Sequence, residues 1–539
     1  MAGFAVGRLD EKGETMNRLT RWLIAILIFA PFAAHAHVGS PDVFFEGNVG
    51  PYPAHITIRM PTVVPGRAEI SVHVDADQPV EVSFLPVFSQ TAVSNAPPPD
   101  AGVPILGETN YYSGELWLMT FGAYSIQVQI HGAAGSGSIE IPVNSLATSQ
   151  LPLPGYLGKI LIALALVLVI GGIAVIVGAA REATVEPGAT PTPRDRRKGW
   201  IAGSVTTLVF VVMIVGGNAW WKSEEKDFRK HLRGGAYPDI TGKVRMDGPQ
   251  RVLDLAIGNK AFEPDYSLSL LPDHGKLLHF FLIREDDEDA FAHIHPVRTG
   301  GKTFAVAVPP LPAGRYRMFC DLTFERTGLS FTAADTVEIP AAPETTATNI
   351  TLAPDPDDSW AVYPAASVKQ GNGTNLIYNL PSGGRVVWRA HPPLRVHQDA
   401  GLQFEIWDAD GHAASLEPYM GMVSHAAVLR RDGSVFAHLH PSGNFSMAAQ
   451  GFFQAKMNRE SGDKTSGDGM AGMPGMEGMN MAGMDHSKMH HAMPHLTKDG
   501  VALISLPYEF PSAGDYRVWV QFKTGGQVQT AVFDASVAP

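Results

Sequence analysis

The sequence predicts a mainly β protein, with immunoglobulin-like β-sandwich domains joined by a two-helix transmembrane hairpin. Many short segments alternate apolar and polar residues and are separated by Pro, Gly and Asn, as expected of strands joined by turns. The 539 residues include 55 Gly and 41 Pro, which fits many such turns. Two apolar stretches near the middle are long enough to cross a bilayer. The length suggests about three or four domains.

Composition narrows the classes of partner. The formal net charge of −12 argues against nucleic acid. Charged residues make up 17% of the chain, a low share for a soluble protein. Cys320 is the single cysteine, so no intramolecular disulfide can form.

Residues 1–36 are expected to be a secretory signal peptide, with Met16 as the true start. Arg18 and Arg21 precede an apolar stretch that ends in an A-x-A cleavage site at residues 34–36. Cleavage there would make His37 the first residue, whose free amine and ring Nδ1 would form a chelate suited to Cu(II). The alternative is that His37 has no such role, because any small or polar residue can follow a cleavage site.

Residues 37–150 are expected to form a periplasmic β-sandwich. Alternating strands are predicted at residues 55–60, 68–74, 80–84, 115–120 and 124–130. An immunoglobulin-like arrangement accounts for this number of short strands.

Two transmembrane helices are predicted, at residues 157–181 and 199–221. Ile160–Ala180 is an uninterrupted run of apolar residues and glycine, and Trp200 and Trp221 flank the second span at interfacial positions. Neither run contains a charged residue, so a transport pathway through this protein alone is not expected.

The loop at residues 182–198 is expected to be cytoplasmic because basic residues cluster in it and at its edge. A second basic cluster follows the second span, but acidic residues are interleaved there. The export signal and the even number of spans favour an inner-membrane protein of a bacterium, with its large domains in the periplasm.

The C-terminal part is an internal duplication of two β-domains, at residues 234–343 and 344–539. Each contains a predicted hairpin that ends in H-x-H-P. In the second copy a two-residue turn at Asp432-Gly433 would set His425 opposite His440, with His438 on the same face. In the first copy a three-residue loop at 286–288 would set His279 opposite His295, with His293 beside it.

These two histidine trios are candidate metal sites. Apolar residues share each face, namely Phe281 and Phe291 in one copy and Ala427 and Phe436 in the other. Close imidazoles beside apolar groups would be disfavoured if protonated and poorly satisfied if neutral, unless a metal joins them. Cu(II) and zinc both suit such sites. The alternative is that each histidine hydrogen-bonds to backbone or solvent.

Candidate fourth ligands precede each trio. His274 stands five residues before the first histidine of one trio, and Met420 stands at the same distance before the other, with Met422 close by.

A Met/His-rich insertion at residues 446–498 of the second copy has no equivalent in the first. Interspersed Gly, Pro, Asn and Asp disfavour packed structure, and eight of the chain's 19 methionines fall within residues 470–495 of it. Thioethers select Cu(I) and Ag(I), and nearby imidazoles extend the range to Cu(II). The candidate ligands are Met470, Met473, Met476, Met479, Met481, Met484, His486, Met489, His490, His491, Met493 and His495.

Enzyme motifs are not found: the sequence has no nucleophile motif, phosphate loop or paired-carboxylate constellation. Cys320 and Met318 share one face of a closing strand, and their counterparts in the second copy are valines, which predicts a core position for both. The short Cys-to-ligand spacing of a blue-copper site is missing. We therefore expect no catalytic activity.

The motifs F-A-H-I-H-P and E-P-Y-M-G-M-V-S-H, with the rest of the second hairpin, give residues 240–539 a resemblance to bacterial exported proteins with YtkA-like, immunoglobulin-type domains. The Met/His segment resembles those of periplasmic copper-resistance proteins, and His37 is similar to the start of the copper-resistance protein C family. These resemblances imply copper or heavy-metal handling.

The function expected from the sequence is therefore a membrane-anchored periplasmic copper-binding protein for tolerance, storage or delivery, with a periplasmic copper-handling protein as a possible partner. Two alternatives stand beside it: a structural or protein-interaction module with non-metal histidines, and a metal-dependent enzyme at a three-histidine site.

Overall fold

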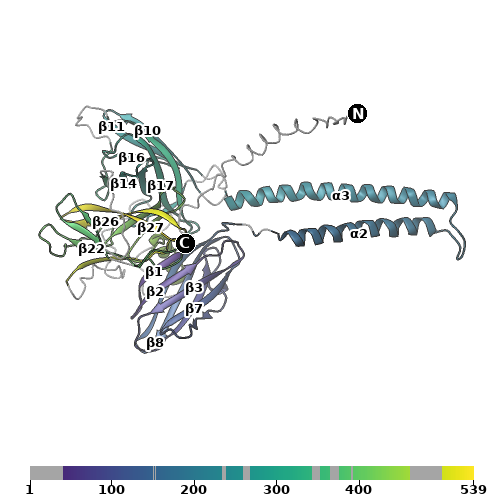
Figure 1. Cartoon of the computed structure of the whole chain (residues 1–539), viewed down its shortest axis with the longest axis horizontal. Coiled ribbons are helices and arrows are strands. Elements are labelled where there is room, and N and C mark those ends of the chain that lie inside the picture. Colours follow the sequence, from purple (N-terminus) through teal and green to yellow (C-terminus); the bar gives the residue numbers. More distant parts are fainter. Residues whose placement is uncertain are drawn as a thin grey trace, which may run out of the picture. The chain divides into compact units, whose positions relative to one another are not determined.

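The computed structural model describes residues 41–149, 151, 153–233, 238–258, 268–342, 352–363, 375–389, 392–461 and 500–539. It is mainly β, with strands arranged in several antiparallel sheets, as the sequence predicts (Figure 1).

The N-terminal domain packs two antiparallel sheets, of order β1-β2-β3-β7-β6 and β5-β4-β8-β9, around one core. Ala68, Ile70 and Val72 of β3 point into this core, whereas Arg67 and Glu69 between them are exposed. This alternation is the period of a half-buried strand. The elements are β1 (Val43–Val49), β2 (Tyr52–Arg59), β3 (Gly66–Val74), β4 (Glu81–Phe88), η1 (Val93–Asn95), β5 (Asp100–Ala101), β6 (Val103–Pro104), β7 (Tyr111–Leu118), β8 (Gly122–Gly132) and β9 (Gly135–Ser145).

Two long helices follow, α2 (Gly155–Glu182) and α3 (Pro193–Arg233), and both are long and apolar enough to cross a membrane. They lie side by side (Figure 1). Gly203 of α3 permits this approach, because a Cβ there would come within 2.8 Å of the Val177 side chain. The second helix extends beyond the expected 199–221 at both ends.

The first repeat contains a sheet of order β10-β11-β16-β15 and a larger sheet, β12-β17-β13-β14-β19, in which β18 also pairs with β17. Ser359–Val362 forms β19 and pairs with β14, although the sequence placed these residues in the second domain. The strands are β10 (Asp239–Asp247), β11 (Gln250–Gly258), β12 (Leu270–Leu271), β13 (His279–Arg284), β14 (Ala290–Ile294), β15 (Val297–Arg298), β16 (Thr303–Ala307), β17 (Gly314–Phe324), β18 (Ser330–Ile339) and β19 (Ser359–Val362).

The second repeat contains sheets of order β20-β21-β22-β25 and β24-β23-β26-β27. The latter order matches β14-β13-β17-β18 of the first repeat, strand for strand. The elements are β20 (Leu376–Asn379), β21 (Arg385–Trp388), β22 (Leu402–Trp407), β23 (His425–Arg430), β24 (Phe436–Leu439), α4 (Met447–Ser461), β25 (Ala502–Leu506), β26 (Gly514–Thr524) and β27 (Gln527–Val537).

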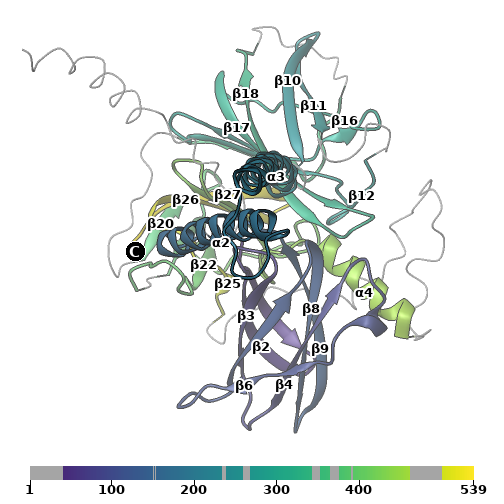
Figure 2. The same ribbon diagram turned by 90° about the vertical axis from the view of Figure 1, so that its right-hand side faces the viewer.

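Helix α4 starts shortly after the second hairpin, and the Ser446 hydroxyl caps it by accepting from the backbone N–H of Ala449 at 3.1 Å. It runs beside β9 (Figure 2), where Gln450 donates to the carbonyl of Glu140 at 2.9 Å.

Strands β13 and β23 are buried on both faces, which explains their continuous apolar runs. Phe280 and Leu282 enter the core of the first repeat, while Phe281 turns to the opposite face. On that face the two repeats meet in a shared apolar cluster, where the rings of Phe319 and Phe436 stack at 4.1 Å. The sequence predicts the apolar faces but not that they cover one another.

The turn predicted at Asp432-Gly433 is wrong in type, although the register it implied is right. A type I′ turn needs positive φ at both central residues and a type II′ turn at the first, but only the second residue, Gly433, has one, at 78°. Strand β23 ends at Arg430, which pairs with Val435 through a 2.9 Å bond from N to O, so the loop is longer. The register survives because the loop grew equally on both sides.

Candidate metal centre

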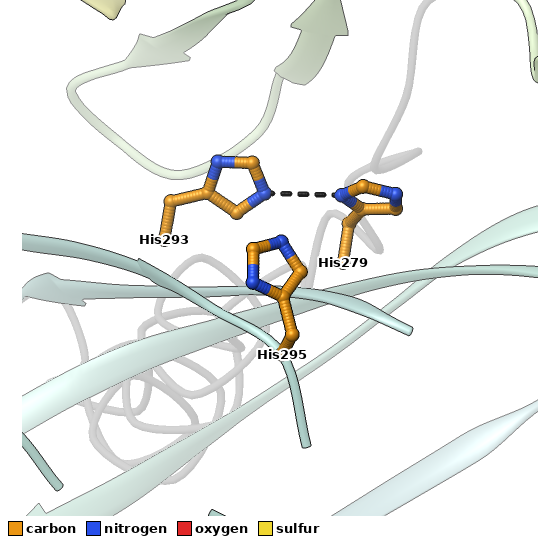
Figure 3. A group of neighbouring side chains, drawn as sticks. All are labelled: His279, His293 and His295. Atoms are coloured by element: carbon orange, nitrogen blue, oxygen red, sulfur yellow. Dashed lines mark hydrogen bonds between the residues drawn. The ribbon is translucent and has the colours of Figure 1, made fainter. Parts of the chain in front are cut away.

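The first trio lies at one end of the hairpin β13–β14. Phe281 pairs with His293 in this ladder, which sets His279 opposite His295 as the sequence predicts. The three side chains each offer a ring nitrogen, and these atoms lie within 4.8 Å of one another. Figure 3 shows the rings converging, with His279 Nδ1 3.1 Å from His293 Nε2.

The second trio repeats this geometry on β23–β24. Ala427 pairs with His438, which sets His425 opposite His440. Ring nitrogens of the three side chains again lie within 4.8 Å of one another, and His425 Nδ1 is 3.3 Å from His438 Nε2.

Backbone carbonyls determine which nitrogen of the first histidine of each trio carries the proton. His279 Nε2 lies 3.1 Å from the carbonyl oxygen of Asp273, and His425 Nε2 lies 3.1 Å from that of Tyr419. A carbonyl can only accept, so each Nε2 must carry the hydrogen. In the neutral ring, each Nδ1 then carries a lone pair that points into its trio.

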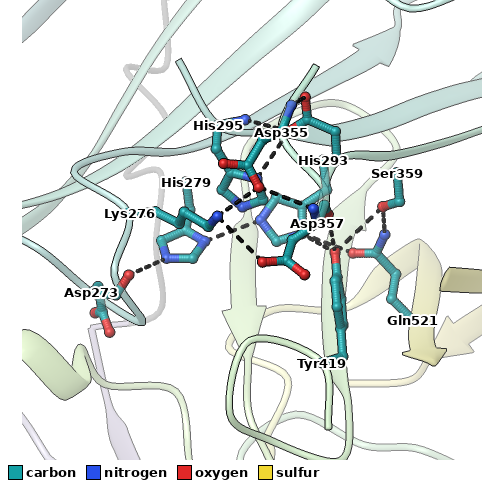
Figure 4. A network of polar contacts seen from close by, with 11 residues as sticks. Asp273, Lys276, His279, His293, His295, Asp355, Asp357, Ser359, Tyr419 and Gln521 are labelled. Atoms are coloured by element: carbon teal, nitrogen blue, oxygen red, sulfur yellow. Dashed lines mark hydrogen bonds and ion pairs between the residues drawn. The ribbon is translucent and has the colours of Figure 1, made fainter. Parts of the chain in front are cut away.

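The second histidine of each trio is held in the opposite tautomer. His438 Nδ1 donates to Asp321 Oδ2 at 3.0 Å, and His293 Nδ1 donates to Gln521 Oε1 at 3.0 Å. Gln521 also donates through Nε2 to Ser359 Oγ, which keeps its oxygen toward His293 (Figure 4). The Nε2 atoms of both histidines therefore present lone pairs inward.

Each trio thus sets two lone pairs against each other at 3.1–3.3 Å, with no proton between them. Two nitrogens bound to one metal at 2.0–2.1 Å with a tetrahedral angle lie about 3.3 Å apart. The spacing fits a shared metal ion. Ligating histidines that donate their other N–H to a carbonyl or carboxylate are typical of metal sites.

The third histidine of each trio is oriented less completely. His295 Nδ1 donates to Asp358 Oδ1 at 3.0 Å, and its Nε2 has no hydrogen-bond partner among the described residues. Neither ring nitrogen of His440 has such a partner there, although the residue is only 4% exposed. A buried polar atom without a partner costs free energy. A metal ion would satisfy these atoms.

Burial lowers the pKa of every trio histidine, and five of the six lie well below the ordinary value of 6.5. Burial also raises the pKa of Asp321 to about 6 and that of Asp358 to about 7. The imidazoles are therefore neutral at neutral pH, which is the form that binds metal.

The two trios face each other across the interface between the repeats. The ring of His438 lies 5.4 Å from the rings of both His279 and His293. Asp321 of β17 pairs with His279 of its own repeat, yet its carboxylate orients His438 of the other repeat. Likewise, Gln521 of β26 pairs with His425 of its own repeat, yet its side chain orients His293 of the other. Each repeat therefore supplies an acceptor that orients a histidine of the other.

An acidic network borders the first trio (Figure 4). Lys276 forms ion pairs with Asp355 at 2.6 Å and Asp357 at 3.2 Å. His295, Asp355 and Asp358 also offer ligand atoms within 4.8 Å of one another.

The remaining sequence candidates are distributed as follows. The His274 side chain is only 6% exposed, and its ring lies 5.3 Å from that of His425 and 5.2 Å from that of His440, nearer than to that of His279, at 6.0 Å. Met420 and Met422 are buried. His37 and all twelve ligands of the insertion lie outside the described residues.

Sequence reasoning missed the oxygen atoms that orient the histidines, namely those of Asp273, Asp321, Asp358, Tyr419 and Gln521. Asp321 and Gln521 occupy equivalent positions in the two closing strands, β17 and β26, each opposite the first histidine of its trio. Aligning these strands would have found the pair. A further cluster, Asp408, Asp410 and His412, is partly or fully exposed and lies in another part of the second repeat.

The chain was compared with known proteins. A family model described as "Domain of unknown function (DUF8832)" matches residues 382–464 and 480–539, which include the second trio. No curated protein matches the chain.

Solved structures give only distant likenesses. They include Salmonella alpha-2-macroglobulin reacted with methylamine (9% identity, 94% of this chain and 24% of that chain, TM-score 0.18). The BSP domain of a biofilm-associated protein (7%, 96% and 70%, 0.14) and the ICAM-5 D1-D4 ectodomain fragment (8%, 91% and 77%, 0.15) are similar at the same level. This chain spans 24% of the length of the Salmonella protein. Likenesses this distant carry no argument about function.

Proposed function

We propose that this chain is a membrane-anchored periplasmic copper-binding protein that acts in copper tolerance, storage or delivery and has no catalytic activity of its own. The observation that carries the proposal is the pair of histidine trios, in which inward lone pairs oppose each other at 3.1–3.3 Å.

Copper is favoured over zinc by what surrounds the trios in the sequence. Neutral imidazole suits both metals, but the thioethers of residues 470–493 select Cu(I). In this proposal the insertion collects Cu(I), and the trios hold copper at fixed sites. Its attachment supports the idea, because Ser446, which caps α4 at the start of the insertion, donates to Asp273 Oδ2 at 2.7 Å. Asp273 also accepts from His279 through its carbonyl.

The location rests on the apolar helices α2 and α3 and on the export signal expected at residues 1–36. The resemblance to YtkA-like exported proteins and to copper-resistance proteins supports the same reading, with a periplasmic copper-handling protein as partner.

Titration of the full chain, purified in detergent, with Cu(I), Cu(II) and Zn(II) tests the proposal. We expect copper to bind with a dissociation constant below micromolar, which corresponds to a binding free energy on the order of −8 kcal/mol or more negative. We also expect copper to outcompete zinc. Copper binding weaker than micromolar, or preferential zinc binding, would overturn it. Metal-dependent turnover of a substrate would instead favour the alternative function, a metal-dependent enzyme at a three-histidine site.

His440→Leu separates binding from folding. Because neither ring nitrogen of His440 has a hydrogen-bond partner among the described residues, an apolar residue there should leave the metal-free protein as stable or more so. Copper affinity should fall. His131→Ala is the matched control, because His131 is exposed on β8 of the N-terminal domain and belongs to none of the groups of candidate metal ligands among the described residues.

A further inference from the structure

We infer that the two trios form a single binuclear centre, with one ion in each trio and with His274 of the first repeat as the fourth ligand of the ion in the second. The inference rests on the proposed function and deepens it, since copper binding alone would not require two adjacent ions.

The distance between the trios carries the first step. The rings of His279 and His438 belong to different trios and have centroids 5.4 Å apart. An ion bound at 2.0–2.1 Å from a ring nitrogen lies about 3.2 Å from the ring centroid. The two ions are therefore at most about 12 Å apart by the same bond lengths. Unpaired electrons on two Cu(II) ions interact measurably at such a distance.

The position of His274 carries the second step. Within the second trio, ring centroids lie 4.6–5.4 Å apart. The ring of His274 is 5.3 Å from that of His425 and 5.2 Å from that of His440, so it lies as close to these two members as the trio's members lie to one another. Its turn reaches across the interface: His274 has a positive φ of 49° and Gly275 one of 81°, the pattern of a primed turn.

The cross-repeat hydrogen bonds carry the third step. Asp321 of the first repeat orients His438 in the second trio, and Gln521 of the second repeat orients His293 in the first. Neither site is complete within one repeat. An ion that fixes one trio also fixes the strand from which the other trio receives its acceptor, so filling of the two sites should be coupled.

Charge supports two ions in one buried place. Among the described residues, five carboxyl groups line the two trios or border them, beside the lysine Lys276: these are Asp273, Asp321, Asp355, Asp357 and Asp358. Two copper ions bring two to four positive charges. Carboxylates at these positions compensate for the repulsion between the ions, which histidines alone would not do.

The test uses a silenced full chain, in which the eight methionines of residues 470–493 are changed to Leu and the four histidines of residues 486–495 to Gln. The reference is the same chain with both His295→Leu and His440→Leu. The copper held by the centre is the difference between the number of ions bound by the silenced chain and by this reference. We expect a difference of two ions per chain. Each single variant should retain one ion.

Electron paramagnetic resonance of the Cu(II) form reports the distance between the ions. As the second equivalent is added to the silenced chain, we expect dipolar broadening, a half-field line or loss of signal. Each single variant should show an ordinary isolated Cu(II) spectrum. One ion per chain that either variant abolishes would mean a single shared site and overturn the inference. Two ions with an uncoupled spectrum would overturn it too.

His274→Leu tests the fourth ligand. In the His295→Leu background, where the second trio retains its ion, we expect affinity to fall at least about tenfold. In the His440→Leu background, where the first trio retains its ion, affinity should stay unchanged. Equal effects in both backgrounds, or none, would contradict this assignment. No ion or a single ion in the silenced chain would overturn the binuclear centre alone, whereas absence of copper binding by the unsilenced chain would overturn the proposed function itself.

Discussion

Asp321 Oδ2 lies 3.0 Å from His438 Nδ1, although the two residues belong to different repeats. The equivalent contact on the other side uses an amide, with Gln521 Oε1 3.0 Å from His293 Nδ1. The duplicated domains are thus joined through reciprocal hydrogen bonds, and one carboxylate breaks the symmetry. A carboxylate partner raises the basicity of a ligating imidazole more than an amide does.

Replacing Asp321 should therefore weaken the second site. We expect Asp321→Leu to lower copper affinity about 10–100-fold, because the orienting acceptor is lost. Asp321→Asn retains an oxygen and should lose less. Both are measured by titration in the silenced His295→Leu chain, with Asp335→Leu as control, because Asp335 is an exposed residue of β18. Equal affinity in all three variants would show that Asp321 does not support the site.

The metal-free protein should lose stability in acid. Burial lowers the pKa of the six trio histidines in the folded state, so below pH 6.5 the unfolded chain binds more protons than the folded one. The free energy of unfolding therefore decreases as the pH is lowered below 6.5. Each imidazole contributes roughly 1.4 kcal/mol per pH unit inside its window. Asp321 and Asp358, whose pKa values are raised to about 6 and 7, act in the opposite direction but are fewer.

Urea unfolding of the chelator-treated protein between pH 5 and 7.5 measures this slope. His440→Leu removes one titrating group and should flatten it. A free energy of unfolding that is constant or increases toward pH 5 would contradict neutral burial of the trios.

The sequence predicts much of the fold, because the strand periodicity and the two apolar stretches are local signals. It also predicts the register of both hairpins: Phe281 opposite His293 and Ala427 opposite His438 follow from counting out from the loops. The prediction of the turn type at Asp432-Gly433 is wrong, but the register is right because the loop is longer by one residue on each side.

The meeting of the trios could not be predicted in this way. It depends on packing of Phe281 and Phe319 of the first repeat against Phe436 of the second, which are far apart in the sequence. An apolar face indicates burial but not its partner. For the same reason His274 was assigned to the trio of its own repeat, whereas its ring lies within 5.3 Å of two histidines of the other.

The aromatic interface should hold both sites in position. Phe436→Ala removes a ring stacked on Phe319 at 4.1 Å, and we expect it to cost about 3–5 kcal/mol of stability. Copper affinity should also fall, because the acceptors of each trio come from the opposite repeat. Phe84→Ala is the control: it is equally buried, but in the N-terminal domain. It should cost similar stability and leave copper affinity unchanged. An equal loss of affinity in both variants would contradict a specific role for the interface.

The Met/His insertion should collect soft metal independently of the trios. Changing the eight methionines of residues 470–493 to Leu should abolish high-capacity Cu(I) and Ag(I) uptake, because thioethers are the soft ligands in this segment. Cu(II) binding at the trios should persist. Equilibrium dialysis with each ion measures both. Undiminished Ag(I) uptake would show that the insertion is not the collector.

Gly443 should matter to the second site although it is not a ligand. It follows His440 and exchanges backbone hydrogen bonds with it, 2.7 Å from His440 N to Gly443 O and 3.0 Å in the reverse direction. Its φ is 145°, and a Cβ there would lie 2.0 Å from the carbonyl oxygen of Phe44. Gly443→Ala must therefore displace either β1 or the turn that ends at His440. We expect it to lower copper affinity in the His295→Leu background and to lower the free energy of unfolding.

The control Gly411→Ala has a φ of 82° but no heavy atom within 4 Å of the added Cβ. It should cost only the backbone strain, about 1–2 kcal/mol, with copper affinity unchanged. If both variants lose stability equally and bind copper normally, the turn after His440 does not position this ligand.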